Sequence, residues 1–357
     1  MNKRGEKMKS ALIEITNRCN LRCKHCFNNS GGKSNDDMEL SALISIIEQL
    51  EKLKVEKITF TGGEPLLYSQ FNELLDFIST SSTRFIFNTN GTIICPRLMA
   101  LQAQKTNVYF QVSLDGASSK TNDYIRGIGS FEKTIHFLKE SVPQRTTIKV
   151  TLNRNNMYQL KDFFELAFSL KIIPRFGYIF NSGRASENWG DLGLSNADIL
   201  LLVKKLEKYA LEYEFDVRNY RLGIFHQCPI NNNQIPTEIF IDYVGNIYPC
   251  GMLTKRAFLL GNIYSSTLKN IVSNKNSQYA TIRQLLLQRQ KLFGLQFCNK
   301  CLVAKTGFCP LDGGCLGSDL NMCFEEGSTC LLKKNYIIYP GLQGYLLKTE
   351  DNKCCTN

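Results

Sequence analysis

The chain has 357 residues, 43% of them hydrophobic and 21% charged, with 22 Phe and 15 Tyr, and this composition excludes an intrinsically disordered protein. No apolar run approaches the roughly 20 residues of a membrane span, and segment 1–10 lacks the apolar core of a signal peptide, so we expect a cytoplasmic protein without membrane contact. The net charge of +11 is spread along the chain without a basic run, which argues against nucleic-acid binding.

Strand-like and helix-like segments alternate from residue 11 to about residue 213. The expected strands are 11–16, 57–60, 84–89, 108–114, 147–153 and 174–180. Between them, apolar residues recur at helical spacing, in the three sets Leu43, Ile46, Ile47, Leu50; Phe71, Leu74, Leu75, Ile78; and Leu160, Phe163, Phe164, Ala167. The pattern predicts a parallel sheet, wound as a partial barrel or as an open doubly wound sheet, with its chemistry at the carboxyl ends of the strands.

The pattern changes after a helix expected at 198–213. Segment 238–250 predicts a hairpin that turns near 244–246, and cysteine-rich loops follow it. We therefore divide the chain into a first domain at 1–218, a second at 219–335 and a tail at 336–357.

The chain contains 14 Cys, and in a reducing compartment short-spaced cysteines indicate metal sites rather than disulfides. Cys19, Cys23 and Cys26 follow the first strand. A zinc ion would need a fourth ligand, and His25 lies between two of these cysteines, where its ring cannot easily join them. Three thiolates on one loop can instead hold three corners of an iron–sulfur cubane and leave one iron open.

A second motif, Thr61-Gly-Gly-Glu-Pro65, ends the second strand. Gly62 and Gly63 would let a ligand approach the backbone, and Glu64 would offer a carboxylate to an ammonium group. The alternative is a glycine-rich turn with a solvated Glu. The position of the motif, one strand after the cysteine triad, favours a ligand site.

With these two motifs in this order, the chain resembles the radical S-adenosylmethionine (SAM) superfamily. The resemblance implies a partial (β/α)6 barrel similar to a TIM barrel, in which Cys19, Cys23 and Cys26 bind a [4Fe–4S] cluster. The SAM amino and carboxylate groups would chelate the fourth iron, and one-electron reduction would produce a 5′-deoxyadenosyl radical that abstracts a substrate hydrogen.

Further motifs at 88–91, 113–116, 122–127, 151–153 and 183–185 are similar to later strand-end signatures of that superfamily. By this resemblance Ser113 would face the ribose and Arg126 the SAM carboxylate, although the family spacing between these two is one residue shorter and a His usually stands at Asn122. The implied SAM pocket contains His25, Gly62, Gly63, Glu64, Asn90, Ser113, Asp115, Arg126 and Asn153. The alternatives are a simple Asp-Gly turn at Asp115 and a surface ion at Arg126.

The later cysteines resemble a SPASM domain, which carries auxiliary iron–sulfur clusters. The resemblance implies one cluster held by Cys228, Cys250 and Cys315, with an open iron or with Cys323, and a second held by Cys298, Cys301, Cys309 and Cys330. The alternative is a zinc ribbon built from Cys298, Cys301, Cys309 and Cys315. We interpret Cys95, Cys354 and Cys355 as free thiols. Three bound clusters would lower the net charge by roughly 5.

The family resemblance predicts an oxidoreductase that modifies a ribosomally made peptide or protein, by crosslinking or another oxidative change, with no catalytic side chain assigned. Expected partners are the precursor and a reductant such as flavodoxin or ferredoxin. The few residues before the first strand leave no room for a winged-helix domain, so leader recognition would use a separate protein or the surfaces of the two domains. One alternative is an anaerobic sulfatase maturase, although such enzymes carry Asp after the hairpin cysteine and Gly251 follows Cys250 here. Another is a non-catalytic zinc protein that binds nucleic acid.

Overall fold

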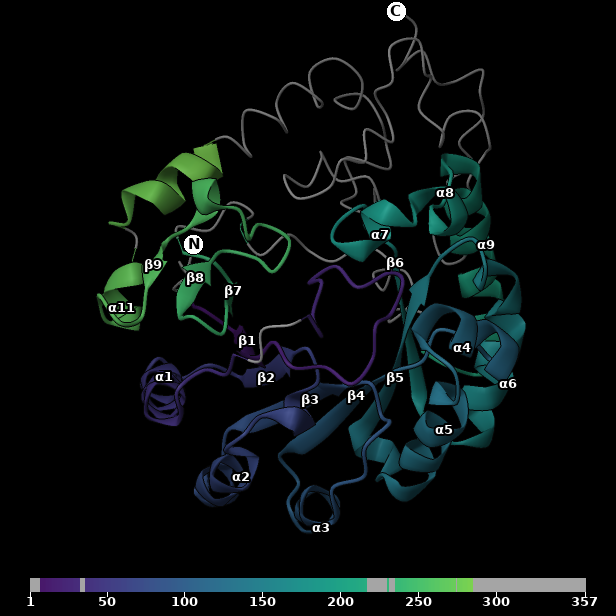
Figure 1. Ribbon diagram of the computed structural model, residues 1–357, viewed down its shortest axis with the longest axis horizontal. Coiled ribbons are helices and arrows are strands. Elements are labelled where there is room, and N and C mark those ends of the chain that lie inside the picture. The colour runs from purple at the N-terminus through teal and green to yellow at the C-terminus, as the bar shows by residue number, and fades with distance from the viewer. Residues whose placement is uncertain (1–6, 33–35, 217–229, 231–234, 274, 285–357) are drawn as a thin grey trace, which may run out of the picture.

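A curved sheet of nine strands, in the order β6-β5-β4-β3-β2-β1-β7-β8-β9, forms the centre of the molecule (Figure 1). The structure is a computed structural model that describes residues 7–32, 36–216, 230, 235–273 and 275–284. Six strands run parallel in the first half of the chain: β1 (Ser10–Thr16), β2 (Lys57–Gly62), β3 (Arg84–Thr89), β4 (Val108–Ser113), β5 (Thr146–Leu152) and β6 (Ile173–Tyr178). The parallel sheet predicted from the alternating pattern is therefore present.

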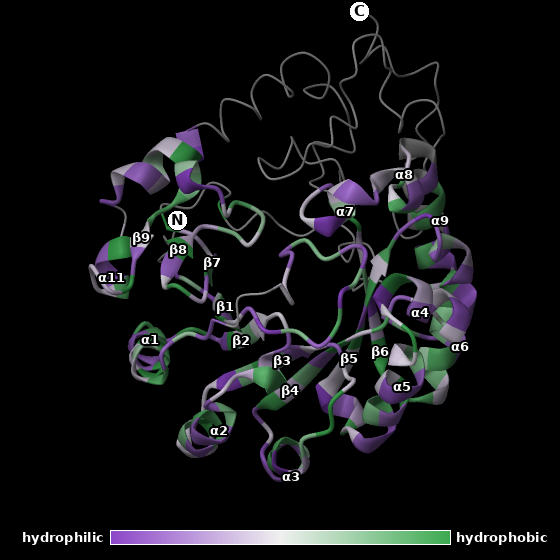
Figure 2. Cartoon of the chain, viewed as in Figure 1, coloured by the Kyte–Doolittle hydropathy of each residue, from purple (hydrophilic) through white to green (hydrophobic). Residues whose placement is uncertain are grey.

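Helices cover the outer side of the curved sheet (Figure 1). They are α1 (Leu40–Lys52), α2 (Phe71–Thr80), α3 (Pro96–Gln104), α4 (Ser119–Arg126), α5 (Ser130–Glu140), α6 (Leu160–Ser169) and α9 (Asn196–Glu212). Two short helices, α7 (Arg184–Glu187) and α8 (Trp189–Leu192), lie at the rim beyond the end of β6 (Figure 1). Short 3-10 turns lie at Pro65–Leu67, Pro143–Arg145 and Met157–Gln159. In α1, α2 and α6 the residues with helical spacing are buried, as predicted. Figure 2 shows that these helices carry both hydrophobic and hydrophilic residues.

Each central strand has an apolar outer face and a more polar inner face. The outer face is rich in buried aromatic rings, and Phe87, for example, contacts Phe60, Phe110 and Phe71 of α2. Burial of each such ring stabilises the fold by about 1.5–3 kcal/mol. The inner face presents Thr61, Asn88, Gln111, Ser113, Lys149 and Thr151, which are only partly buried. The helices therefore pack on one side of the sheet and leave the polar side for a ligand.

The described part of the later chain extends the same sheet. Strand β7 (Glu238–Ile241) pairs in parallel with β1, and β8 (Asn246–Tyr248) and β9 (Gly261–Asn262) follow in antiparallel order. The turn between β7 and β8 contains Gly245 at φ +82°, close to where the sequence predicts it. Beyond it lie the 3-10 turn Arg256–Phe258 and helix α11 (Leu268–Ile271). The expected domain boundary at 218/219 lies outside the described residues.

In the described ranges, no helix has the length and apolar character needed to cross a membrane.

Candidate functional site

The cysteine loop leaves the carboxyl end of β1 and lies inside the curve of the sheet (Figure 1). Cys23 is 8% exposed, and its thiol donates to the backbone carbonyl of Arg126 at 3.8 Å. Cys19 and Cys26 are partly exposed. Burial raises the pKa of the Cys19 thiol to about 12, with further increases from Glu64, Cys23 and Cys26. The three predicted cluster ligands are thus close enough to influence one another electrostatically.

Arg184, the first residue of α7, holds this loop by hydrogen bonds. Its guanidinium donates to the carbonyls of Cys23 and Ser30, both at 2.9 Å, and its backbone N–H donates to the carbonyl of Cys26 at 2.9 Å. Gly183 precedes it at φ +56°, and a Cβ atom there would lie 2.4 Å from the Cys26 carbonyl oxygen. The 183–185 motif therefore packs against the cysteine loop and fixes its backbone.

The glycines of the second motif bring β2 against the start of the cysteine loop. Gly62 has φ +145°, and a Cβ atom there would lie 2.1 Å from the carbonyl oxygen of Thr16. A Cβ atom on Gly63 would lie 2.0 Å from the carbonyl oxygen of Arg18. Any side chain at either position would collide with backbone. The sequence predicts that these glycines let a ligand approach the backbone; in the structure they let the backbone of the cysteine loop approach β2.

Glu64 lies completely buried between the ends of β2 and β3. Its carboxylate accepts hydrogen bonds from the Thr89 hydroxyl at 2.8 Å and from the backbone N–H of Asn90 at 2.7 Å. Burial raises its pKa to about 7, against the opposite effect of these hydrogen bonds. The Asn90 side chain in turn donates to Asn20 in the cysteine loop at 2.9 Å. The alternative of a solvated Glu is therefore wrong.

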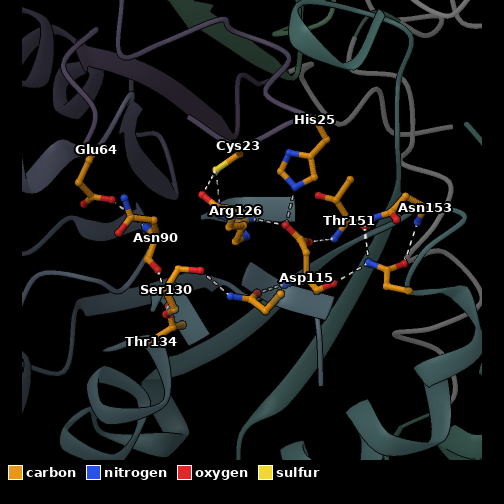
Figure 3. Close-up of polar contacts among 12 residues, drawn as sticks. Cys23, His25, Glu64, Asn90, Asp115, Arg126, Ser130, Thr134, Thr151 and Asn153 are labelled. Carbon is orange, nitrogen blue, oxygen red and sulfur yellow. Dashed lines mark hydrogen bonds and ion pairs between the residues drawn. The ribbon is translucent and has the colours of Figure 1, made fainter. Parts of the chain in front are cut away.

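Asp115 is the centre of a buried charged cluster at the ends of β4 and β5 (Figure 3). Its carboxylate contacts His25 Nε2, pairs with the Arg126 guanidinium at 2.6 Å and accepts from the backbone N–H of Thr151 at 2.6 Å. Burial opposes its charge, but Arg126 and then His25 hold its pKa down to about 2. The carboxylate of Asp115 is therefore ionised and paired, directly beside the cysteine loop.

Arg126 has a donor that this cluster does not use. It is 7% exposed, so the alternative of a surface ion is wrong. One terminal nitrogen lies 4.0 Å from Cys23 Sγ, and its Nε is buried without a hydrogen-bond partner in the described part of the chain. A buried orphan donor beside the three cysteines fits an anionic ligand group, because leaving it unpaired costs about 1–3 kcal/mol.

Amide side chains hold the turns around this cluster. Asn122 accepts from the backbone N–H of Asp115 at 2.9 Å, and Asn153 donates to the Thr151 carbonyl at 3.0 Å. Asn156 donates to the Asp115 carbonyl at 3.0 Å, a contact that the sequence does not predict because the residue resembles any polar turn residue. Ser113 ends β4 and is paired in register with Lys149 of β5.

The donor set suits an iron–sulfur cluster better than a single ion. In the described ranges, no three His, Cys, Asp or Glu side chains gather closely enough to hold one metal ion. A cubane does not need such a gathering, since each thiolate binds a different iron. A thiol whose pKa is raised by burial is deprotonated when iron coordinates it. The three cysteines, with Arg126 beside them, therefore fit a cluster with a ligand-binding iron.

The other predicted cluster ligands fall mainly outside the described residues. Cys250 follows β8, and its neighbour Gly251 lies against Leu12 of β1. The ligand predictions outside the described residues are Cys228, Cys298, Cys301, Cys309, Cys315, Cys323 and Cys330.

Comparisons with known proteins agree with this geometry. Residues 13–167 match the model of the radical SAM superfamily, and residues 228–302 match SPASM, an iron–sulfur cluster-binding domain. The mycofactocin maturase MftC of Mycobacterium tuberculosis is 30% identical over 76% of this chain and 71% of its own. The subtilosin biosynthesis protein AlbA of Bacillus subtilis is 25% identical over 91% and 71%. Streptococcus suis SuiB, crystallised with S-adenosylmethionine, shares the fold with a TM-score of 0.68 at 17% identity, over 87% of this chain and 73% of its own.

Proposed function

Because the chain belongs to the radical SAM superfamily, we propose that it is a maturase that modifies a residue of a ribosomally made peptide or protein. The observation that carries this proposal is the triad Cys19, Cys23 and Cys26 on one loop beside the orphan donor of Arg126. Its cofactors are SAM, a [4Fe–4S] cluster and auxiliary iron–sulfur clusters. Two relatives named for maturation support the substrate class, a mycofactocin maturase and the sporulation killing factor maturation protein SkfB, and SuiB of similar fold was crystallised with a precursor peptide.

The three cysteines would hold the cluster, and Arg126 would bind the SAM carboxylate through the donor that has no partner in the described chain. Bound SAM supplies, on one-electron reduction, a 5′-deoxyadenosyl radical that takes a hydrogen atom from the substrate. Arg184 keeps the cysteine loop in place, and Glu64 keeps Asn90 against that loop. Arg126 pairs with Asp115, which also contacts His25, so the pocket wall carries no free carboxylate at this position.

The finer parts of the proposal concern the second half of the chain. Cys250, with Cys228 before it and the six cysteines from Cys298 to Cys330 after it, would hold the auxiliary clusters. A flavodoxin or ferredoxin in the cytoplasm would supply electrons, and a separate protein or the enzyme's own surfaces would recognise the precursor. Gly251 after Cys250 favours this chemistry over formylglycine formation.

The test of this proposal is the triple substitution of Cys19, Cys23 and Cys26 by Ala in anaerobically reconstituted protein. Wild-type protein with dithionite and SAM should form 5′-deoxyadenosine, and the triple variant should form none. Wild-type protein should contain about twelve irons and the variant about eight, on cubane stoichiometry. The control is Cys95→Ala, outside both cysteine groups, with unchanged activity. Formation of 5′-deoxyadenosine by the triple variant would disprove the ligand assignment, and zinc in place of the remaining iron would disprove the auxiliary clusters.

A further inference from the structure

Two cationic side chains lie next to each other on the inner face of the sheet. Lys149 of β5 and Arg175 of β6 are paired in register, and residues paired in this way in parallel strands point to the same face. The neighbouring Phe176 packs against Phe163 and Phe164 of α6, on the outer face. Arg175 and Lys149 therefore point into the curve of the sheet, where the site lies.

This arrangement is unfavourable for the protein alone. Like charges directly opposite each other on neighbouring strands destabilise a sheet. Burial and then Arg175 lower the pKa of Lys149 to about 8. Among the described residues, neither side chain has an ion pair or a hydrogen bond to a carboxylate, and the acid that acts on Lys149 is Asp115. Asp115 is already paired with Arg126, His25 and the Thr151 N–H, so it cannot neutralise the pair.

The Lys149 side chain extends toward the carboxyl ends of β5 and β6. Its Nζ lies 3.1 Å from the position where a Cβ atom on Gly177 would stand, and Gly177 is paired in register with Thr151. The ammonium group of Lys149 thus lies level with Thr151, which is two residues further along β5 and whose N–H donates to Asp115. Gly177 leaves room beside it that any larger side chain would take.

We propose that Lys149 and Arg175 form an anion site that receives a carboxylate group of the peptide substrate. This inference rests on the proposed function, which supplies the peptide. A carboxylate between the two cations would remove their repulsion and would be bound by charge-assisted hydrogen bonds, which are about twice as strong as neutral ones. The site would position the peptide on the β5–β6 wall, beside Ser113.

SAM also carries a carboxylate, but a different place fits it better. Arg126 lies 4.0 Å from Cys23 Sγ, next to the iron that would bind the SAM amino acid, and it has an unpaired donor in the described chain. Lys149 and Arg175 belong to the last two strands of the parallel series, whereas the cysteine loop follows β1. The pair is therefore available to the substrate.

The test measures the pKa of Lys149 in the anaerobically reconstituted enzyme, by NMR of lysines tagged with ¹³C-methyl groups. The signal is assigned as the one that Lys149→Arg removes. Three probes at about 10 mM are compared: acetyl-Gly-Gly with a free C-terminal carboxylate, acetyl-Gly-Glu-amide with a side-chain carboxylate, and the neutral acetyl-Gly-Gln-amide. We expect a carboxylate probe to raise the pKa of Lys149 by at least about one pH unit, as a nearby opposite charge does. The neutral probe and the exposed Lys133 should show no change.

The outcomes separate the sources of the carboxylate. If the C-terminal probe acts more strongly, the site takes a peptide terminus; if the Glu probe does, it takes a side chain. If no probe raises the pKa, the anion site is disproved. If SAM alone raises it, and Lys149→Gln weakens SAM binding at least tenfold, the carboxylate belongs to SAM and the proposal is overturned. No turnover is required, so the result is independent of whether the cysteine assignment holds.

Discussion

The two faces of the parallel sheet have different compositions and different roles. On the outer face, Phe60, Phe85, Phe87 and Phe110 are at most 1% exposed. The residues that alternate with these along the strands point to the inner face, and many of them carry hydroxyl, amide or amine groups. The comparison teaches that stability depends mainly on the outer face and ligand binding on the inner face and its rim. Substitutions on the two faces should therefore have separable effects.

The largest expected effect tests the outer face. Phe87→Ala removes a fully buried ring in contact with three other rings and should lower the free energy of unfolding by about 3–5 kcal/mol. Urea unfolding of the anaerobic protein, followed by circular dichroism, measures this change. Ile128→Ala, at a residue 99% exposed, is the control and should leave unfolding unchanged. A loss below about 1 kcal/mol at Phe87 would refute the assignment of stability to this face.

The second prediction concerns Asp115, a residue at the inner rim that should contribute to stability although most of the stability depends on the outer face. Asp115→Asn keeps the shape of the side chain but leaves Arg126 buried without its counter-charge, and breaking such a pair costs about 3–5 kcal/mol. The same unfolding measurement detects it. Asp76→Asn, which breaks the exposed pair with Arg97, should cost about 0–1 kcal/mol. Equal effects of the two substitutions would mean that the buried cluster has no structural role.

The third prediction concerns the pH dependence of stability through Glu14. This residue is 3% exposed on the inner face, accepts a hydrogen bond from Asn28, and burial raises its pKa from 4.5 to about 7. The folded state then holds more protons than the unfolded state between these values, so the contribution of Glu14 to stability is fully present below pH 4.5 and is lost as the pH rises to about 7. Glu64 contributes in the same direction.

Glu14→Gln should therefore flatten the profile, by up to roughly 3 kcal/mol between pH 5 and pH 8 at 1.36 kcal/mol per unit. Unfolding at a series of pH values measures the difference. The control is Glu132→Gln on the exposed surface of α5, with the wild-type profile. A Glu14→Gln profile parallel to that of wild type would show that folding does not raise the pKa of Glu14.

The smallest expected effect separates binding from stability at the rim. Glu64→Gln removes the carboxylate that the sequence predicts to bind the SAM ammonium and that also accepts from Asn90 and Thr89. Loss of one charge-assisted hydrogen bond should weaken SAM binding by about 1.5–3 kcal/mol, or roughly one to two decades in affinity. Anaerobic calorimetry with SAM measures the dissociation constant. Glu73→Gln, exposed on α2, serves as the control. Unchanged affinity in Glu64→Gln would remove Glu64 from the SAM pocket.

The sequence predicts the outer face well because local patterns determine it. The expected strand at 84–89 has the bounds that the structure shows, since Phe85 and Phe87 alternate there with Arg84, Ile86 and Asn88, which point to the other face. The pairing of β7 with β1 is not predicted, because no local pattern records which distant strand an edge strand joins. The number of strands in the sheet therefore depends on long-range pairing that the sequence pattern does not show.

At the site, the sequence predicts residue types but not their surroundings. The motif containing Arg184 is recognisable, yet its contact with Cys23 appears only in three dimensions. Glu64 is predicted as a ligand group, and its complete burial has no signature in a glycine-rich motif. Lys149 is missed because a lysine in an alternating strand resembles an ordinary solvent-facing residue.

The pairing of β1 with β7 also sets an order of events during synthesis. The hydroxyl of Ser10 donates to Glu238, a residue 228 positions later, so β1 has only one of its two neighbours until the ribosome has passed β7. At about 5–20 residues per second, this delay is roughly 10–45 seconds. During this delay, the cysteine loop follows a strand that has one unpaired edge. We therefore expect the nascent barrel to remain accessible to the iron–sulfur assembly machinery until the hairpin has been translated.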